Sequence, residues 1–183
     1  MNAPARGALA RAAGREAPRV AATGGGVDAM VDENRFRDVM SRLVTGVALV
    51  TCRLDGSVHG LTVNAVSSVS LNPPLVLVCL DRRGNSHDPV IASGAFAVSV
   101  LASHQEEMAH RFARGTHRER FASVEFRDSS SGSPVLPDAL AWLDCRVRAV
   151  HPAGDHSIVV GEVLGCGAGE GDPLVFFRSE YGR

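Results

Sequence analysis

The dipeptide Asp55-Gly56 lies between two runs rich in β-branched residues, in the stretch VALVTCRLDGSVHGLTVNAV. Asp-Gly in this setting is the strongest short-range signal for an antiparallel hairpin. The stretches 81–89 and 114–138 indicate polar loops, and further β-rich runs follow at 75–80, 95–101, 139–150, 156–164 and 174–177. Because no regular alternation of strand and helix appears, a parallel doubly wound sheet is not expected. The pattern predicts a mainly β fold, a small closed or half-open barrel of about six to seven antiparallel strands.

Two segments carry helical patterns, and two or three helices are expected in all. These helices would lie at the periphery of the barrel. Apolar residues recur at i, i+3, i+4 and i+7 between residues 36 and 43, which predicts a helix that begins near Asp32 and ends at Gly46. The S-x-x-E sequence at 103–106 is a capping box, and it predicts a second helix over 104–113. The run at 75–80 is apolar throughout, which predicts a strand buried on both faces.

Length and composition indicate one domain, 31–183, behind an extension at 1–30 that is rich in Ala, Gly, Pro and Arg and is expected to be flexible. The formal net charge is −1, so no overall field attracts the chain to nucleic acid or an anionic membrane. No apolar run has the length that spans a bilayer. The four cysteines are widely spaced and form no C-x-x-C pair, which favours free thiols in the cytoplasm.

Several catalytic motifs are absent from the sequence. There is no H-E-x-x-H, G-x-S-x-G or P-loop sequence, and the seven histidines have no metal-ligand spacing, so no metal site is predicted. The glycines between 165 and 171 precede a proline and a strand rather than a helix, so any nicotinamide must bind without a Rossmann unit. Asp155 and His156 adjoin at a strand start, where neighbouring side chains point to opposite faces, which argues against an Asp–His pair. His156 alone remains a candidate for the rim of a site.

The segment GLTVNAVSSVSL at 60–71 has an unusual density of small polar side chains. As one strand, its odd positions form an apolar face, and its even positions carry Thr62, Asn64, Ser68 and Ser70. One interpretation is the solvent face of an antiparallel strand, which periodicity alone favours. The other is a platform on which a flat polar ring lies, because short side chains let it come close and can bind its edge. The loop at 82–87, RRGNSH, is either a charged turn or a phosphate site.

Five motifs resemble one known family in order and spacing: FRDVMSRLVTGVALVT, GLTVNAVSSVSLNPPLVLVCL, FAVSVLASHQEEMAHRFA, LDCRV and GDHSIVVGEV. Together they are similar to the short-chain flavin reductases, the NAD(P)H:flavin oxidoreductase components of two-component monooxygenases. The resemblance runs from Phe36 to Tyr181 and implies an FMN-binding split β-barrel, a homodimer and a flavin near the subunit interface. Val44 stands where relatives usually have proline, next to the corner at 45–47. His87 stands where many relatives have a second Ser or Thr, and this leaves both FMN and FAD open.

The resemblance also implies roles for individual residues. The strand segment would contact the flavin ring and ribityl chain, the 83–86 loop its phosphate, and the G-D-H turn at 154–156 the nicotinamide. His156 is the candidate catalytic residue, expected to position the nicotinamide. The implied cofactor-binding residues are Thr45, Gly46, Val47, Thr62, Val63, Asn64, Ala65, Ser67, Ser68, Val69, Cys79, Asp81, Arg83, Gly84, Asn85, Ser86, Phe112, Gly154, Asp155, His156 and Tyr181.

The implied activity is hydride transfer from NADH or NADPH to FMN or FAD, with a diffusible flavin that leaves reduced to serve a partner monooxygenase. Such chemistry belongs to the cofactors, and the protein supplies orientation. Backbone N–H groups at 64–69 would stabilise charge on the reduced ring. Two alternatives stay open: an oxidoreductase that holds FMN tightly and acts on its own substrate, and a non-catalytic flavin- or haem-binding module.

Overall fold

The computed structural model describes residues 31–182, and the extension predicted at 1–30 lies outside the described residues. The chain divides into two units, Met1–Asp32 and Glu33–Arg183, and the elements below belong to the second. Within the described residues, no helix combines the length and the apolar character needed to cross a membrane.

Strands form the body of this unit. Their bounds are β1 Thr45–Gly46, β2 Ala48–Leu54, β3 Ser57–Val63, β4 Val66–Leu71, β5 Pro74–Asp81, β6 Ala95–Val100, β7 Arg127–Asp128, β8 Pro134–Val135, β9 Ala141–Ala153, β10 His156–Ala168, β11 Val175–Phe177 and β12 Glu180–Gly182. The helices are α1 Glu33–Ser41, α2 His87–Ser93, α3 Glu106–Arg114 and α4 His117–Phe121, with a 3₁₀ turn at Ser103–Gln105. The mainly β fold with few helices predicted from the sequence is confirmed.

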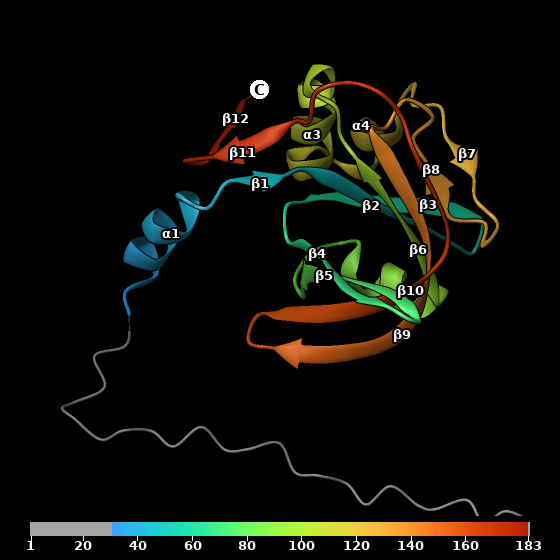
Figure 1. Cartoon of the computed structure of the whole chain (residues 1–183), viewed down its shortest axis with the longest axis horizontal. Helices are drawn as coiled ribbons and strands as arrows, with labels where there is room; N and C mark the ends of the chain where they lie inside the picture. The colour runs from blue at the N-terminus through green and yellow to red at the C-terminus, as the bar shows by residue number, and fades with distance from the viewer. Residues whose placement is uncertain (1–30, 183) are drawn as a thin grey trace, which may run out of the picture. The chain divides into compact units, whose positions relative to one another are not determined.

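The main sheet has seven antiparallel strands in the order β3-β2-β6-β9-β10-β5-β4. Its two edge strands, β3 and β4, are consecutive in the chain and separated only by Asn64 and Ala65. The chain between Val63 and Val66 reaches at most about 11 Å, whereas seven flat strands would set the edges roughly 29 Å apart. The sheet must therefore curl until its edges meet, and Figure 1 shows it wrapped into a barrel. At the seam, the Cys79 N–H donates to the Ala65 carbonyl oxygen at 3.1 Å.

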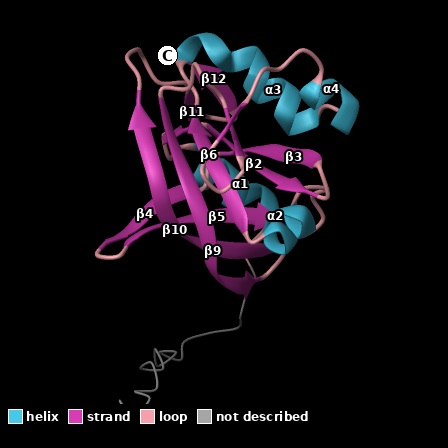
Figure 2. Cartoon of the chain, turned by 90° about the vertical axis from the view of Figure 1, so that its right-hand side faces the viewer, coloured by secondary structure: helices cyan, strands magenta, loops and turns pink. Residues whose placement is uncertain are grey.

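Two apolar clusters lie on opposite faces of β2, which is buried along most of its length. Ala48, Val50 and Cys52 point into the barrel, where they pack with Phe96 and the inner faces of β5, β6 and β10. Val47 and Leu49 point outward into a cluster beneath α3. Figure 2 shows α3 and α4 at one end of the barrel and α2 toward the other.

The last strands form a separate three-stranded sheet, in the order β1-β11-β12. Thr45 pairs with Phe176, and Phe176 pairs with Tyr181. The hairpin turns at Arg178 and Ser179, which adopt left-handed φ angles of 50° and 65°. The hairpin carries Tyr181 back toward the start of the barrel. The sequence predicted one strand at 174–177, and the returning strand β12 was missed because it is only three residues long.

The Asp55-Gly56 hairpin is confirmed, with the positive φ angles of 50° and 79° that a type I′ turn requires. The predicted end of the first helix at Gly46 is wrong. The helix ends at Ser41, after which the Arg42 and Leu43 N–H groups bond to carbonyl oxygens three residues back. Such bonds tighten the chain and stop the α-helix. Gly46 instead lies in β1.

The capping box predicted at Ser103 does not form. Ser103 lies inside the 3₁₀ turn, and the Gln105 side chain instead accepts from the Ala102 N–H at 2.9 Å. A capping box does form at Thr116 and Glu119, where α4 begins, inside a stretch predicted to be loop. The predicted loop at 81–89 is also partly wrong, because helix α2 begins at His87.

The prediction that the 75–80 strand is buried on both faces is wrong in part. Val76, Val78 and Leu80 face the core, while Leu75, Leu77 and Cys79 are half-buried on the other face. Strands β9 and β10 are longer than expected, at 13 residues each, and only Gly154 and Asp155 form the turn between them.

Candidate functional site

Two adjacent hollows open at the corner formed by Asn64 and Ala65. The larger, of about 560 Å³, lies between α1 and this corner. The smaller, of about 110 Å³, lies between β3 and the C-terminal hairpin. They share Asn64 and Phe176. Of the residues predicted to bind the flavin, those that line one hollow or the other are Thr45, Val47, Thr62, Val63, Asn64, Ala65, Ser67 and Tyr181.

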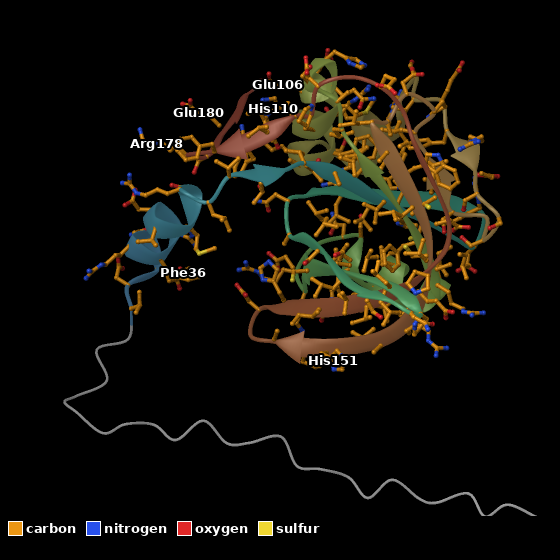
Figure 3. All side chains as sticks on the ribbon, in the orientation of Figure 1. Phe36, Glu106, His110, His151, Arg178 and Glu180 are labelled. Atoms are coloured by element: carbon orange, nitrogen blue, oxygen red, sulfur yellow. The ribbon has the colours of Figure 1, made fainter. Side chains whose placement is uncertain are left out.

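The larger hollow has a small, polar floor and an apolar wall. Its floor is formed at Ala65 and Ser67, where β3 has ended and β4 begins. Its wall is formed by Phe36 and Met40 of α1 and by Leu43 just after the helix, which remain 58%, 45% and 58% exposed. Figure 3 shows Phe36 on this helix, apart from the dense packing of the barrel. A groove with one apolar side and a shallow polar floor suits a flat heteroaromatic ring.

In the smaller hollow, neighbouring side chains fix two polar groups. The Thr62 hydroxyl donates to the Ala109 carbonyl oxygen of α3 at 2.7 Å, so its oxygen can only accept from a ligand. The Tyr181 ring packs against His110, with ring centroids 4.7 Å apart, and Figure 3 shows His110 beside the C-terminal hairpin. Burial raises the pKa of Tyr181, so the phenol is neutral near pH 7.

One polar atom in the wall of the larger hollow has its hydrogen-bonding capacity unused. The Thr45 hydroxyl oxygen is shielded from solvent and has no hydrogen-bond partner among residues 31–182. Buried hydroxyl groups are normally paired, so an orphan in a groove wall is a group that a bound ligand can satisfy. Together with the exposed Asn64 amide and the small Ala65, this hydroxyl fits the polar edge of a flavin ring.

A second group of predicted residues gathers where β5 and β10 pair. Asp81 stands opposite His156 in the register of the two strands. Asp81 accepts from the backbone N–H, Nε and Nη2 of Arg83, at 2.9, 3.2 and 3.1 Å. The next backbone N–H, of Arg82, donates to the Asp155 carbonyl oxygen at 3.0 Å. The 81–84 loop and the Gly154-Asp155 turn therefore form one bonded unit.

The two groups belong to one region of the surface. Leu77 of β5 lines the larger hollow, and Asp81 lies four residues further along the same strand. Arg83 also interacts electrostatically with Glu33 of α1, the helix that forms the wall of that hollow. In Figure 1 the β9–β10 turn opens on the same side of the barrel as α1.

The expectation that Asp155 and His156 cannot pair is wrong. The His156 Nδ1 lies 2.7 Å from Asp155 Oδ1. Alternation of side chains holds only within a strand, and Asp155 is in the turn, after Gly154 with its φ of 65°. A turn with positive φ at its first central residue is typical of a tight two-residue hairpin. The His156 side chain is 43% exposed, and its ring orientation is fixed by the carboxylate.

These contacts set the charge of the carboxyl groups. Hydrogen bonds from Arg83 lower the pKa of Asp81 to about 2. The hydrogen bond from His156 lowers the pKa of Asp155 below its usual value. The pairing with Asp81 in turn raises the pKa of Arg83. Both carboxylates are therefore ionised throughout the neutral and mildly acid range, and each holds a cationic or donor side chain in place.

Several predicted residues lie away from the hollows or are turned from solvent. The Ser86 hydroxyl is buried and donates to the Gly60 carbonyl oxygen at 2.9 Å. Phe112, on the inner face of α3, is fully buried and packs edge-on against Phe121. Ser68 and Val69 are exposed further along β4. Cys79 lies behind Ala65, to which its N–H is bonded.

The sequence missed the apolar walls of the hollows. Phe36, Met40 and Leu43 were recognised as part of one helical face, but no role in a site was predicted for them. Phe176 was assigned to a last strand without a role, and it lines both hollows. Among residues 31–182 no three or more His, Cys, Asp or Glu side chains gather where they could hold a metal ion.

Arg83→Gln is expected to raise the pKa of Asp81 from about 2 toward the ordinary value near 4, because it removes the side-chain hydrogen bonds that favour the carboxylate. An NMR titration of the Asp81 carboxyl carbon measures the change. Arg82→Gln, which leaves the Arg83 side chain in place, is the matched control. An Asp81 pKa that stays near 2 in Arg83→Gln would contradict this account of the loop.

Comparison with known proteins agrees with the geometry. Residues 40–183 match the model of the flavin reductase like domain. The chain is 44% identical over 152 residues to the actinorhodin polyketide dimerase of Streptomyces coelicolor, which covers 82% of this chain and 85% of that protein. It is 38% identical over 148 residues to the FMN reductase (NADH) SmoA of Agrobacterium fabrum, covering 81% and 84%.

Among solved structures, the fold matches the NADH:FAD oxidoreductase SgcE6 of Streptomyces globisporus in complex with NAD and FAD fragments. The TM-score is 0.78 at 34% identity, covering 83% of this chain and 92% of that one. A family model that spans most of the chain, relatives of nearly full length and a common fold all lead to the same conclusion. The chain belongs to the flavin reductase-like family.

Proposed function

We propose that this protein is an NAD(P)H-dependent flavin reductase that transfers hydride from the nicotinamide to FMN or FAD and supplies reduced flavin to a partner monooxygenase. The observation that carries the proposal is the corner at Asn64 and Ala65, where an open groove contains an orphan Thr45 hydroxyl and includes Leu77 of β5, the strand whose end at Asp81 pairs with His156. Relatives bear names of the same kind, among them the reductase component of a 4-nitrophenol monooxygenase from Rhodococcus opacus.

The residues of the larger hollow would hold the flavin ring. Ala65 lets the ring come close, the Asn64 amide and Thr45 hydroxyl can bond its polar edge, and the apolar α1 wall covers part of it. Backbone N–H groups of the 64–69 segment would stabilise negative charge as it develops on the ring. The N–H donors of Arg83 that Asp81 leaves unused would bind the flavin phosphate.

When bound, the flavin supplies the redox chemistry, because it accepts two electrons as a hydride from the nicotinamide. The chain contributes position. With its Nδ1–H donated to Asp155, the His156 ring has Nε2 left to form a hydrogen bond with a ligand. A nicotinamide carboxamide N–H is a suitable donor for that nitrogen. His156 would thereby orient the nicotinamide over the flavin without itself transferring a proton.

We further propose that the protein is a homodimer. Helix α1 buries none of its residues, and the apolar face formed by Phe36, Val39 and Met40 with Leu43 just after the helix is 45% to 58% exposed. Apolar surface of this kind in a soluble enzyme is typical of an interface. A second copy seated on α1 would also close the larger hollow, since the same helix forms its wall.

The proposal also includes a cytoplasmic location. The four cysteines are all free, two of them buried and Cys166 exposed. Exposed free thiols are stable in a reducing compartment. NAD(P)H and an oxygenase that receives reduced flavin are likewise expected there.

One alternative has an observation in its favour. The relative from Streptomyces coelicolor is named as a polyketide dimerase, which acts on an organic molecule. A protein of that type would hold its flavin tightly and use its own substrate. Purified protein that stays yellow through extensive dialysis would favour it.

The main test is an assay of NADH and NADPH oxidation against FMN and FAD. The expected result is oxidation that depends on added flavin, at a rate that saturates with flavin concentration, because the groove is open and the flavin exchanges. Absence of flavin-stimulated oxidation, together with no quenching of flavin fluorescence by the protein, would refute the proposed function.

His156→Ala is expected to raise the KM for NADH about tenfold, or to slow turnover, while the Kd for flavin changes less than about threefold. The reason is that loss of one hydrogen-bonding side chain costs about 1 to 2 kcal/mol where that group binds. His151→Ala, at an exposed position of β9, is the matched control. Kinetic constants equal to those of the wild type would exclude His156 from the site.

Phe36→Asp with Leu43→Asp is expected to convert a dimer into a monomer, because it places two charges in the apolar α1 face. Sedimentation velocity measures the mass. Arg35→Asp in the same helix controls for added negative charge. A wild-type protein that sediments as a monomer would reject the dimer.

A further inference from the structure

His87 is a buried histidine at the end of the 81–87 loop, next to the start of β10. It is the first residue of α2 and only 7% exposed. Both ring nitrogens have partners. Nδ1 lies 2.7 Å from Asp88 Oδ1, and Nε2 lies 2.9 Å from the Ser157 hydroxyl oxygen. Ser157 is itself only 3% exposed, so the contact between His87 Nε2 and Ser157 lies in the interior.

The His87–Ser157 contact joins two segments that are 70 residues apart in the chain. His87 ends the loop that begins with Asp81, and its N–H donates to the Gly84 carbonyl oxygen at 3.0 Å. Ser157 directly follows His156 and pairs with Leu80 on β5. The ring therefore holds the end of the proposed phosphate loop against the start of β10.

Two backbone contacts join the same segments further out. The Arg82 N–H bonds to the Asp155 carbonyl oxygen, and His156 pairs with Asp81. Asp155, His156, Arg82 and Arg83 are all exposed to some degree, so solvent competes for their bonds. The contact between His87 and Ser157 is shielded from water. In the protein interior a hydrogen bond is electrostatically stronger, and leaving its partners unpaired is costly.

We propose that His87 is a positioning residue: its ring clamps the 81–87 loop to β10 through Ser157 and so fixes His156 relative to the bound flavin. This inference rests on the proposed function. Hydride transfer depends steeply on the relative placement of donor and acceptor. The phosphate loop sets the position of the flavin, the turn sets that of the nicotinamide, and His87 ties the two together.

Ser157, His87 and Asp88 are hydrogen-bonded in the order found in a hydrolytic triad, but they cannot act as one. A serine nucleophile must reach a substrate carbonyl, and Ser157 is buried. Asp88 is the exposed member, with a side chain 91% accessible, whereas the acid of a triad is shielded. The arrangement is a link between elements.

Two substitutions separate the contacts of the ring. A Gln side chain brings its amide near the position of Nε2, so His87→Gln can retain the bond to Ser157. An Asn side chain reaches only near the position of Nδ1, so His87→Asn loses that bond. Ser157→Ala removes the other partner of the link. Asp88→Asn is the matched control, because its contact with His87 is exposed and contributes little.

The measurement is the single-turnover rate of flavin reduction at saturating NADH and flavin, with the Kd for flavin and the thermal unfolding midpoint. We expect His87→Asn and Ser157→Ala each to lower the rate about tenfold. The double variant should be no slower than either single one, because both remove the same link. His87→Gln and Asp88→Asn should stay within about twofold of the wild type, and the Kd for flavin within about threefold in all variants.

Three results would overturn the positioning role. One is a wild-type rate in Ser157→Ala. The second is an equal loss in His87→Gln and His87→Asn, and the third is a loss that appears only in the unfolding midpoint or the flavin Kd. If His87→Asn does not fold, the comparison of Ser157→Ala with His87→Gln decides. A wild-type protein without flavin-dependent NADH oxidation refutes the proposed function itself, which is a separate outcome.

Discussion

Closure of the barrel across two residues is the constraint on which the site depends. Strand β3 pairs with β2 and strand β4 with β5, so the chain must cross from one edge of the sheet to the other between Val63 and Val66. Asn64 and Ala65 can then belong to neither strand, and their side chains face outward at the seam. Of the small polar residues that made this segment unusual, Asn64 lies at this corner outside both strands, whereas Thr62, Ser68 and Ser70 remain in paired strands. The groove is a consequence of how the barrel closes.

The second half of the site depends on β5, whose two neighbours serve different parts of it. On one side β4 brings the groove floor, and on the other seven paired positions hold β10 and its turn. A register shift by one residue would turn Asp81 and His156 to the other face. The distance from groove to turn is thus set by strand pairing rather than by loop conformation. Such rigid placement is what a reaction controlled by orientation needs.

Features that follow from local pattern could be predicted from the sequence. The Asp55-Gly56 hairpin and the long strands are of this kind, because turn chemistry and alternation are local. Features that depend on distant partners could not. The Ser86 hydroxyl donates to the carbonyl oxygen of Gly60, 26 residues earlier. Phe112 of α3 packs inward because Gly60 leaves room for its ring, which lies 3.2 Å from where a Cβ would be. The Asp155–His156 pair was missed for a different reason. The alternation of side chains along β10 was extended by one residue to Asp155, which lies in the turn and does not follow it.

The charges of the site bear on whether the flavin is held or released. Arg83 is the guanidinium proposed to bind the phosphate, and Asp81 accepts hydrogen bonds from its Nε and Nη2. The low pKa of Asp81 keeps that carboxylate ionised and bonded to the guanidinium at any physiological pH. A phosphate must then bind to the remaining donors of a guanidinium already paired with a carboxylate, and the bond is weaker than one to a free arginine. This arrangement suits an enzyme whose flavin arrives, is reduced and leaves better than one whose flavin is retained.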